Sequence, residues 1–430
     1  MDDARAIAFS SLLIGLLVGV HPVAVDIVPS LPAASLVVTL DGLPVARLTR
    51  PPWTAEVDFG EALRPHELVA TALDRSGREV GRVSRWVNTP QPPARVEILL
   101  ESDEKGRPRS ARMVATSGRR QAPVRRSLTL DGRKLDVDAA GQATLPKLDL
   151  TRVHVLRAVV DYSRDAIARA EIAFGGDVGD ASGSVLTAVA VRLTGRKAPD
   201  ISEIRDAFRG PSGPVVPVAI EKEGATVLLV RHPLHDEAHR RLGTANRDFP
   251  LRFDGGDEVG YVWPVSLAPE DGSVQSELFE IIGPFGEADP GYSWLLTHVR
   301  RVGDRSSPPY RFADAVAIAG LQACSAGRRR AVVLVEGEER RDASQLSPRQ
   351  VEDYLASLGV PLRVWSLLRN SPTRWKDGQV EDVSSFPDLS NAVLRLKELL
   401  SRQRIVWVSG AWAPGVVTLA PGVTAIELVR

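Results

Sequence analysis

Three of the seven histidines of the chain lie close together, at His232, His235 and His239. Imidazole nitrogens bind zinc, so these three side chains could form a His₃ zinc site. The segment does not follow the His-Glu-x-x-His order, and the arginines that flank it on both sides would repel a cation. We therefore interpret it as a solvated loop or helix end.

Three carboxylates follow in the same region, at Asp254, Asp257 and Glu258. Two neighbouring carboxyl groups can act as general acid and general base. One alternative for the whole chain is therefore a hydrolase whose site lies in residues 232–310 and uses either a metal at the three histidines or a pair of these acids.

The other reactive side chains indicate no catalytic centre. Cys324 is the only cysteine, which excludes an intrachain disulfide and a zinc site built from cysteines. It lies in an alanine-rich helical segment with no histidine nearby in sequence, and this predicts a buried, inert thiol. Arg328–Arg330 precede an apolar run, and we expect them at an exposed helix end. No glycine-rich phosphate loop follows any predicted strand.

Composition limits the class of partner. The 430 residues are enough for two to four domains of about 100–200 residues each. Basic and acidic residues number 54 each, so the net charge is zero. Nucleic acid and anionic membranes both attract proteins with a basic excess, and neither is therefore expected as the main partner.

Residues 6–25 contain no charged side chain. This apolar run is long for a signal peptide and barely long enough to span a bilayer. We predict that residues 1–30 are a signal peptide that exports the protein to the periplasm, the cell envelope or the exterior. An uncleaved membrane anchor and a buried core strand or helix are the alternatives.

Residues 31–92 and 93–176 are each predicted to form an all-β sandwich, because short strands alternate with turn residues. An Asp-Gly turn followed by a histidine recurs in both, with 25 positions from Asp to His in the first segment and 23 in the second. The two sets are Asp41-Gly42 with His66 and Asp131-Gly132 with His154. The segments VTLDG, PPW, VDFG, PHELVATALDRSG and WVN resemble bacterial immunoglobulin-like modules, which implies spacer or binding domains without catalysis.

Helices and strands alternate along the last 120 residues, which predicts βαβ units and a parallel sheet with its ligand at the carboxyl ends of the strands. The expected helices are 312–325, 348–358 and 389–401, and the expected strands are 331–335, 362–366 and 404–408. The apolar run 185–193 is expected to be the first parallel strand. After a linker at 177–184, residues 185–430 are thus predicted to form one α/β Rossmann-like domain with a polar insertion at 232–310 and a C-terminal β-hairpin.

Several segments of this region resemble the von Willebrand factor A domain. They are RFADAVAIAGLQA, RRRAVVLVEGEE, QVEDYLASLGVPLRVWSL and DLSNAVLRLKELL, and the tail RIVWVSGAWAPGVVTLAPGVTAIELV resembles the hairpin of the bacterial "VWFA-related" group. The resemblance implies a divalent cation, Mg²⁺ or Ca²⁺, held by an Asp-x-Ser-x-Ser segment, a Thr and an Asp. The cation would accept a carboxylate from a partner protein.

This chain departs from the family pattern at each cation ligand. TGRKAP follows the expected first strand, Tyr310 stands in place of the Thr, four residues before Asp314, and Glu336 stands in place of the Asp. Asp180, Ser182 and Ser184 match Asp-x-Ser-x-Ser, but they precede a strand instead of following one, so we interpret them as linker. We therefore expect no metal, no cofactor and no catalytic residue.

We expect a non-catalytic, exported protein-binding or assembly module that works without a divalent metal. Its predicted surface is the carboxyl edge of the parallel sheet, together with residues 232–310. The residues assigned to that edge are Thr194–Lys197, Tyr310 and Glu336–Arg341. A purely structural envelope spacer is the third hypothesis.

Overall fold

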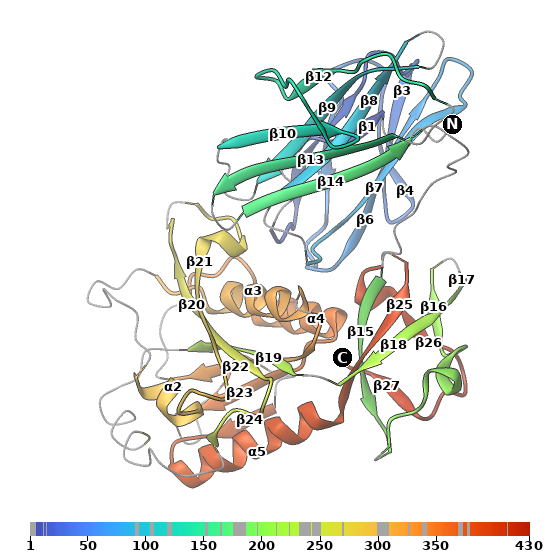
Figure 1. Ribbon diagram of the computed structural model, residues 1–430. Coiled ribbons are helices and arrows are strands. Elements are labelled where there is room, and N and C mark those ends of the chain that lie inside the picture. Colours follow the sequence, from blue (N-terminus) through green and yellow to red (C-terminus); the bar gives the residue numbers. More distant parts are fainter. Residues whose placement is uncertain are drawn as a thin grey trace. The chain divides into compact units, whose positions relative to one another are not determined.

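The computed structural model describes residues 6–430 with gaps. The gaps are residues 12, 14, 91–93, 104–106, 118–122, 151–153, 164–165, 175–185, 196, 212, 223, 232–241, 243–250, 269–270, 299–308, 326, 338–341, 369–372, 376–378 and 411. The chain divides into two compact units, one of residues 1–62 and 66–183 and the other of residues 63–65 and 184–430. Strands run through both units, and the α-helices of the described chain lie in the second (Figure 1).

Seven antiparallel strands form the first β-sandwich, with sheet orders β1-β2-β5 and β4-β3-β6-β7. They are β1 (Ile7–Phe9), β2 (Val20–Ile27), β3 (Ser35–Leu40), β4 (Leu43–Leu48), β5 (Thr54–Asp58), β6 (His66–Leu73) and β7 (Glu79–Val87). Because side chains alternate across a strand, Leu36, Val38 and Leu40 of β3 all point into the core between the sheets.

The second sandwich repeats this connectivity, with sheet orders β12-β9-β8 and β11-β10-β13-β14. Its strands are β8 (Ala94–Ser102), β9 (Pro108–Ser117), β10 (Arg125–Leu130), β11 (Arg133–Leu135), β12 (Gln142–Thr144), β13 (His154–Ser163) and β14 (Ala166–Phe174). Both are sandwiches of the immunoglobulin and fibronectin-III type, so the two β-sandwiches predicted from the sequence are confirmed.

The boundary predicted after residue 30 is wrong. Residues 7–9 and 20–27 are strands β1 and β2, and Ile7, Phe9, Val23 and Val25 are buried in the core of the first sandwich. The uncharged run is therefore explained by burial between two sheets, which needs apolar side chains as much as a membrane does. Within the described residues, no helix is long and apolar enough to cross a membrane.

The repeated Asp and His residues form the same contact in both sandwiches. Asp41 accepts a hydrogen bond from Nδ1 of His66 at 2.7 Å, and Asp131 accepts one from Nδ1 of His154 at 2.7 Å. The second carboxylate oxygen accepts the backbone N–H that follows each histidine, at 2.9 and 2.8 Å. Each aspartate lies in a tight turn with φ of 51° or 50°, and the glycine after it also has positive φ, as this turn requires. Each pair thus joins a turn to the neighbouring strand of its sheet, β6 in the first sandwich and β13 in the second.

The His154 pair predicts a pH-dependent contribution to stability. His154 also donates from Nε2 to the carbonyl oxygen of Asp149 at 3.0 Å, so both ring nitrogens carry protons in this arrangement. The hydrogen bond to Asp131 raises the pKa of His154, and the same bond lowers the pKa of Asp131. The histidine's share of the stability is full below its unfolded pKa of 6.5 and is lost as the pH rises through its higher folded pKa. The aspartate's share is full above 3.8 and is lost as the pH falls through its lower folded pKa.

We therefore expect His154→Gln to destabilise the first unit by about 1–2 kcal/mol at pH 5, because glutamine cannot carry the charge. The loss should be smaller at pH 9. Urea unfolding of both proteins at the two pH values measures the difference, and an equal loss at pH 5 and pH 9 would contradict the pairing.

A six-stranded sheet forms the centre of the second unit, in the order β21-β20-β19-β22-β23-β24. The strands are β19 (Ala225–Arg231), β20 (Glu258–Ser266), β21 (Phe279–Phe285), β22 (Arg329–Glu336), β23 (Leu362–Ser366) and β24 (Gln379–Asp382). All neighbours pair in parallel except β20 and β21. Numbered along the chain, this is the order 3-2-1-4-5-6 of a doubly wound sheet.

Helices cover both faces of this sheet (Figure 1). They are α2 (Tyr292–His298), α3 (Phe312–Ser325), α4 (Pro348–Leu358) and α5 (Phe386–Arg402). α2 and α5 pack on one face, where their apolar side chains join those of the strands in one core. α4 shows clear sequence signals at both ends, because Ser347 and Gln350 form a capping box and Gly359 ends the helix with φ of 63°.

A smaller β-region completes the second unit, with sheet orders β18-β25-β15-β27 and β17-β16-β26. Its strands are β15 (Leu186–Leu193), β16 (Phe208–Gly210), β17 (Gly213–Val215), β18 (Pro217–Glu221), β25 (Gln403–Ser409), β26 (Thr418–Leu419) and β27 (Ile426–Leu428). Short 3₁₀ helices η1 (Ile201–Ile204), η3 (Ser276–Leu278) and η4 (Pro414–Val416) also occur in this unit.

Three predictions about residues 185–430 are corrected. β15 is not a parallel strand of the main sheet, because it pairs antiparallel with β25. The predicted strand 404–408 lies within β25 and therefore also belongs to the smaller sheet. Residues 232–310 are not an insertion, since β20 and β21 are two of the six strands of the main sheet.

Candidate functional site

The carboxyl ends of five parallel strands share one edge of the main sheet. These ends are Arg231 of β19, Ser266 of β20, Glu336 of β22, Ser366 of β23 and Asp382 of β24. In a doubly wound sheet the ligand crevice lies where the strand order reverses, which here is between β19 and β22. Arg231 and Glu336 therefore occupy the position at which chemistry is expected. Thr194–Lys197 were assigned to this edge, but they follow β15 in the other sheet, so that assignment is wrong.

Arg231 places a permanent positive charge at the end of β19. Its side chain is buried, with 5% of the residue exposed. The guanidinium lies 5.4 Å from the ring centroid of Tyr261 and 5.3 Å from that of Trp263, and it donates a hydrogen bond to the carbonyl oxygen of Leu296. Cation–π contacts of this kind stabilise a buried guanidinium by up to about 2 kcal/mol.

Tyr261 is held in place on the same side of the sheet. Its hydroxyl donates to the carbonyl oxygen of Leu295 in α2 at 2.9 Å, and its ring stacks on Trp263 with a centroid distance of 5.5 Å. Burial raises the pKa of Tyr261 to about 12, so its hydroxyl stays neutral beside Arg231. The aromatic pair and α2 thus form a fixed cradle for the guanidinium.

Tyr310 lies just before α3 and is buried, with 7% exposed. The prediction that it forms part of an open binding surface is therefore wrong. Its ring stacks on Phe312 at 5.3 Å. Its carbonyl oxygen accepts the backbone N–H of Ala343 at 2.7 Å, which joins the start of α3 to the loop after β22.

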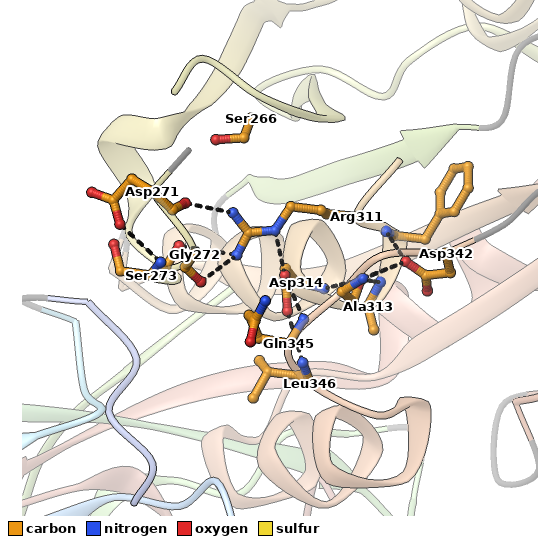
Figure 2. A network of polar contacts seen from close by, with 12 residues as sticks. Ser266, Asp271, Gly272, Ser273, Arg311, Ala313, Asp314, Asp342, Gln345 and Leu346 are labelled. Atoms are coloured by element: carbon orange, nitrogen blue, oxygen red, sulfur yellow. Dashed lines mark hydrogen bonds and ion pairs between the residues drawn. The ribbon is translucent and has the colours of Figure 1, made fainter. Parts of the chain in front are cut away.

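That loop also caps α3 (Figure 2). Asp342 accepts the backbone N–H of Phe312 at 3.0 Å. The hydroxyl of Ser344 accepts the N–H groups of Ala313 and Asp314 at 3.0 and 3.3 Å. The first N–H groups of the helix, which could otherwise bind an anion, are therefore satisfied by the chain itself.

Asp314 and Arg311 form the buried centre of this network (Figure 2). Asp314 is 0% exposed and accepts from Nε of Arg311 at 2.7 Å and from the backbone N–H groups of Gln345 and Leu346 at 3.0 Å each. The guanidinium of Arg311 also donates to the carbonyl oxygens of residues 271, 272 and 273. Burial raises the pKa of Asp314, and the N–H donors and Arg311 oppose that rise. Three separate segments, 271–273, 311–314 and 345–346, are thus joined around one ion pair.

Glu336 is half-buried at the end of β22. Its carboxylate accepts a hydrogen bond from the hydroxyl of Thr373 at 3.2 Å, and burial raises its pKa. Residues 338–341 of the predicted surface lie outside the described residues, as do His232, His235, His239, Asp180, Ser182 and Ser184.

The three predicted acids lie at the amino edge of the sheet, opposite the expected ligand position. Asp257 accepts the backbone N–H of Ala225 at 2.7 Å, and burial raises its pKa. Asp254 pairs with Lys397 at 2.7 Å and Glu258 with Arg328 at 2.7 Å. These contacts join strand starts and helix ends, so we assign the acids a structural role. Among the side chains that the structure places, no group of three His, Cys, Asp or Glu residues could hold a metal ion.

Cys324 is buried, as predicted, and burial raises the pKa of its thiol. Arg330 was expected at an exposed helix end, but it is 0% exposed. Its guanidinium donates to four carbonyl oxygens, including those of Cys324 at the end of α3 and Leu358 at the end of α4. The expected attraction to helix C-termini is therefore present inside the protein.

Arg231 is the residue that sequence reasoning missed. The run Ala225–Arg231 is buried at every position, and the signal was an apolar strand that ends in a charged residue. The cation ligands were expected after residues 185–193, but that strand belongs to another sheet.

Comparison with known proteins gives little further information. No family model matches the chain, and no curated protein matches it. Solved structures match at low similarity. The fibronectin(III)-like modules of Clostridium thermocellum CbhA are 14% identical over 40% of this chain and 93% of that chain, with a TM-score of 0.17. The central fibronectin-III array of RIM-binding protein is 13% identical over 41% of this chain and 72% of that one, with a TM-score of 0.21.

Proximal thread matrix protein 1 from the mussel byssus is 13% identical and covers 49% of this chain, which spans half of that one, with a TM-score of 0.25. Another structure of that protein has zinc in its MIDAS motif and is 12% identical, with the same coverage and TM-score. Similarities at this level carry no argument about function.

Proposed function

We propose that the chain is a non-catalytic protein-binding or assembly module of the cell exterior or envelope, with a von Willebrand factor A-like domain that has lost its cation. Two β-sandwiches would carry this domain as spacers. The sheet order and the segments that resemble the family support the assignment of the domain.

Arg231 is the single observation that carries the proposal. β19 holds the position of the first strand, and where the family has Asp-x-Ser-x-Ser the sequence reads Arg231-His-Pro-Leu-His235. The buried guanidinium of Arg231 would repel a divalent cation at the same edge of the sheet. The positive charge that the family obtains from a metal ion would here be part of the protein.

We expect no metal dependence of stability. Any ion that binds only the folded protein raises the melting temperature by mass action. The melting temperature in EDTA should therefore equal that in excess Mg²⁺, Mn²⁺, Ca²⁺ or Zn²⁺. A saturable rise with the first three would contradict the loss of the cation site, and a rise with Zn²⁺ alone would favour the histidine cluster of the hydrolase alternative.

Partner binding is tested on the carboxyl edge itself. Glu336→Ala changes a half-buried carboxylate at the switch point, whereas Glu221→Ala removes an exposed one at the end of β18. If this edge binds a protein, immobilised Glu336→Ala should capture less of it from envelope extracts than the wild type, and Glu221→Ala should capture as much. Equal capture by all three would remove this edge as the interface, and no capture by the wild type would favour the spacer hypothesis.

A further inference from the structure

A second polar site lies at the amino edge of the main sheet, where β23 begins. It is a pocket of about 480 Å³, which is large enough for a small-molecule ligand. Residues of α4 and of the second half of α5 line it, together with Arg192 of β15 and Arg430. Nothing in the proposed function uses this edge.

The pocket is rich in arginine. Five arginines and three carboxylates line it, and two further carboxylates, Glu381 and Glu427, pair with lining arginines, so the charges balance formally. The arginines are Arg192, Arg363, Arg395, Arg402 and Arg430, and the carboxylates are Glu352, Asp353 and Glu398. Three of the exposed arginines have carboxylate partners, since Arg192 pairs with Glu427, Arg395 with Glu381 at 2.7 Å and Arg402 with Glu398 at 3.4 Å.

Arg363 is the unusual member of this set. Its side chain is 9% exposed, and its nearest carboxylate oxygen, on Glu381, is 3.9 Å away, which is beyond hydrogen-bond distance. Glu381 already accepts from Nε of Arg395 at 2.7 Å and from Nε1 of Trp365 at 3.0 Å. Within the described part of the chain Arg363 donates no hydrogen bond, and its Nε is buried without a partner.

Other arginines at this edge have clear structural roles. Arg329 donates to the carbonyl oxygens of Gly224 and Leu400, and Arg404 donates to those of Ser401 and Gln403. These bonds satisfy the carbonyl oxygens at the C-terminus of α5 and just before β19, as expected for cations near a helix end. Arg363 and Arg395 donate to no carbonyl oxygen among the residues that the structure places. Helix-end neutralisation therefore does not explain this pair.

The unpartnered donors of Arg363 indicate what kind of ligand the pocket could bind. Glu381 lies between two guanidinium groups but bonds only to that of Arg395, so the donors of the buried Arg363 are unused within the described residues. Burying a charged group without hydrogen bonds is costly, and a planar guanidinium binds carboxylate or phosphate oxygens through two parallel bonds. An anion in the pocket would supply acceptors for these donors.

We propose that this pocket binds a small molecule that carries a phosphate or carboxylate group, with Arg363 and Arg395 as the recognising residues. The site lies at the edge of the sheet opposite to Arg231, and it does not depend on the proposed protein partner.

The test uses the full chain with inorganic phosphate and with citrate as probes, against sodium chloride at matched ionic strength. Each ligand should raise the melting temperature in a saturable way, and isothermal titration should give a dissociation constant for it. The probe with the lower dissociation constant identifies phosphate or carboxylate as the preferred group. Arg363→Gln and Arg395→Gln should each weaken binding about tenfold or more, whereas Arg349→Gln, an exposed arginine in the first turn of α4, should not.

Three results would overturn the proposal. One is no stabilisation by either anion beyond the chloride control. Another is binding that survives in both pocket variants. The third is equal weakening by Arg349→Gln, which would mean that only general charge matters. Because Arg395 is half exposed, its variant keeps the test valid if Arg363→Gln does not fold.

Discussion

Replacement of Asp314 by asparagine is expected to lower the free energy of unfolding of the second unit by about 3–5 kcal/mol. The fully buried carboxylate accepts three N–H donors, and one of them is the guanidinium of Arg311. An asparagine has only one acceptor oxygen, so its NH₂ group would face a donor, and Arg311 would lose its counter-charge inside the protein. Removing one partner of a buried ion pair costs more than the pair contributes, because the other charge remains.

Urea unfolding followed by circular dichroism measures this loss. The matched control is Asp353→Asn, an exposed aspartate on α4, which should change stability by less than about 0.5 kcal/mol. A double-mutant cycle with Arg311→Ala and Asp314→Ala separates the pair from its surroundings. The double variant should lose less than the sum of the single ones. Additive losses would mean that the two residues act independently, contrary to the 2.7 Å contact.

Local signals predicted the helices and the repeated sandwiches well. The helices 312–325 and 348–358 match α3 and α4, and the strand 362–366 matches β23. These elements have short-range signals, such as the Ser347 capping box and the terminal Gly359 of α4. The Asp-Gly turns are equally local, and their recurrence with His66 and His154 indicated the repeat, although the Asp–His contact that both sandwiches share is seen only in the structure.

Sheet membership could not be read in the same way. Residues 186–193 and 225–231 are both apolar strands of similar length, and periodicity cannot tell which one lies in the parallel sheet. The partner of β15 is β25, more than 200 residues away, and no local pattern records such a pairing. The N-terminal strands were misread for a related reason, because a short run such as Ile7–Phe9 is as apolar in a sandwich core as in a leader peptide.

The candidate site depended on that choice of strand. Once β19 is known to be the first parallel strand, the sequence alone shows Arg231 where an aspartate was sought. Its burial against Tyr261 and Trp263 could not be predicted, since β20 was assigned to an insertion. Tyr310 and Glu336 were correctly placed beside the carboxyl edge, but burial of Tyr310 depends on packing against Phe312 and on the loop at Asp342.

Arg330 gives the second large expected effect, because its side chain joins β22 of the main sheet to the ends of α3 and α4 and to β15 of the smaller sheet. It donates to Gly359 and Leu358 at the end of α4, to Cys324 at the end of α3, and to Ala188 of β15 at 3.1–3.3 Å. Arg330→Ala would remove four hydrogen bonds to these carbonyl oxygens and would open a cavity of about the size of the side chain. Among the described residues, only the carbonyl oxygen of Cys324 keeps a backbone donor, from Gly327 at 3.3 Å. We expect a loss of at least about 4 kcal/mol, since each unsatisfied buried polar group costs about 1–3 kcal/mol.

The control is Arg402→Ala, which removes an arginine from the last turn of α5, where the side chain is 60% exposed and pairs with an exposed Glu398. This change should cost less than about 0.5 kcal/mol. Arg330→Met keeps the volume but not the donors, so its loss should remain near that of Arg330→Ala if hydrogen bonds dominate. A methionine variant as stable as the wild type would contradict this account and would show that packing alone holds β15 against the helix ends. Urea unfolding of the three variants distinguishes these outcomes, because the donors and the volume are removed separately.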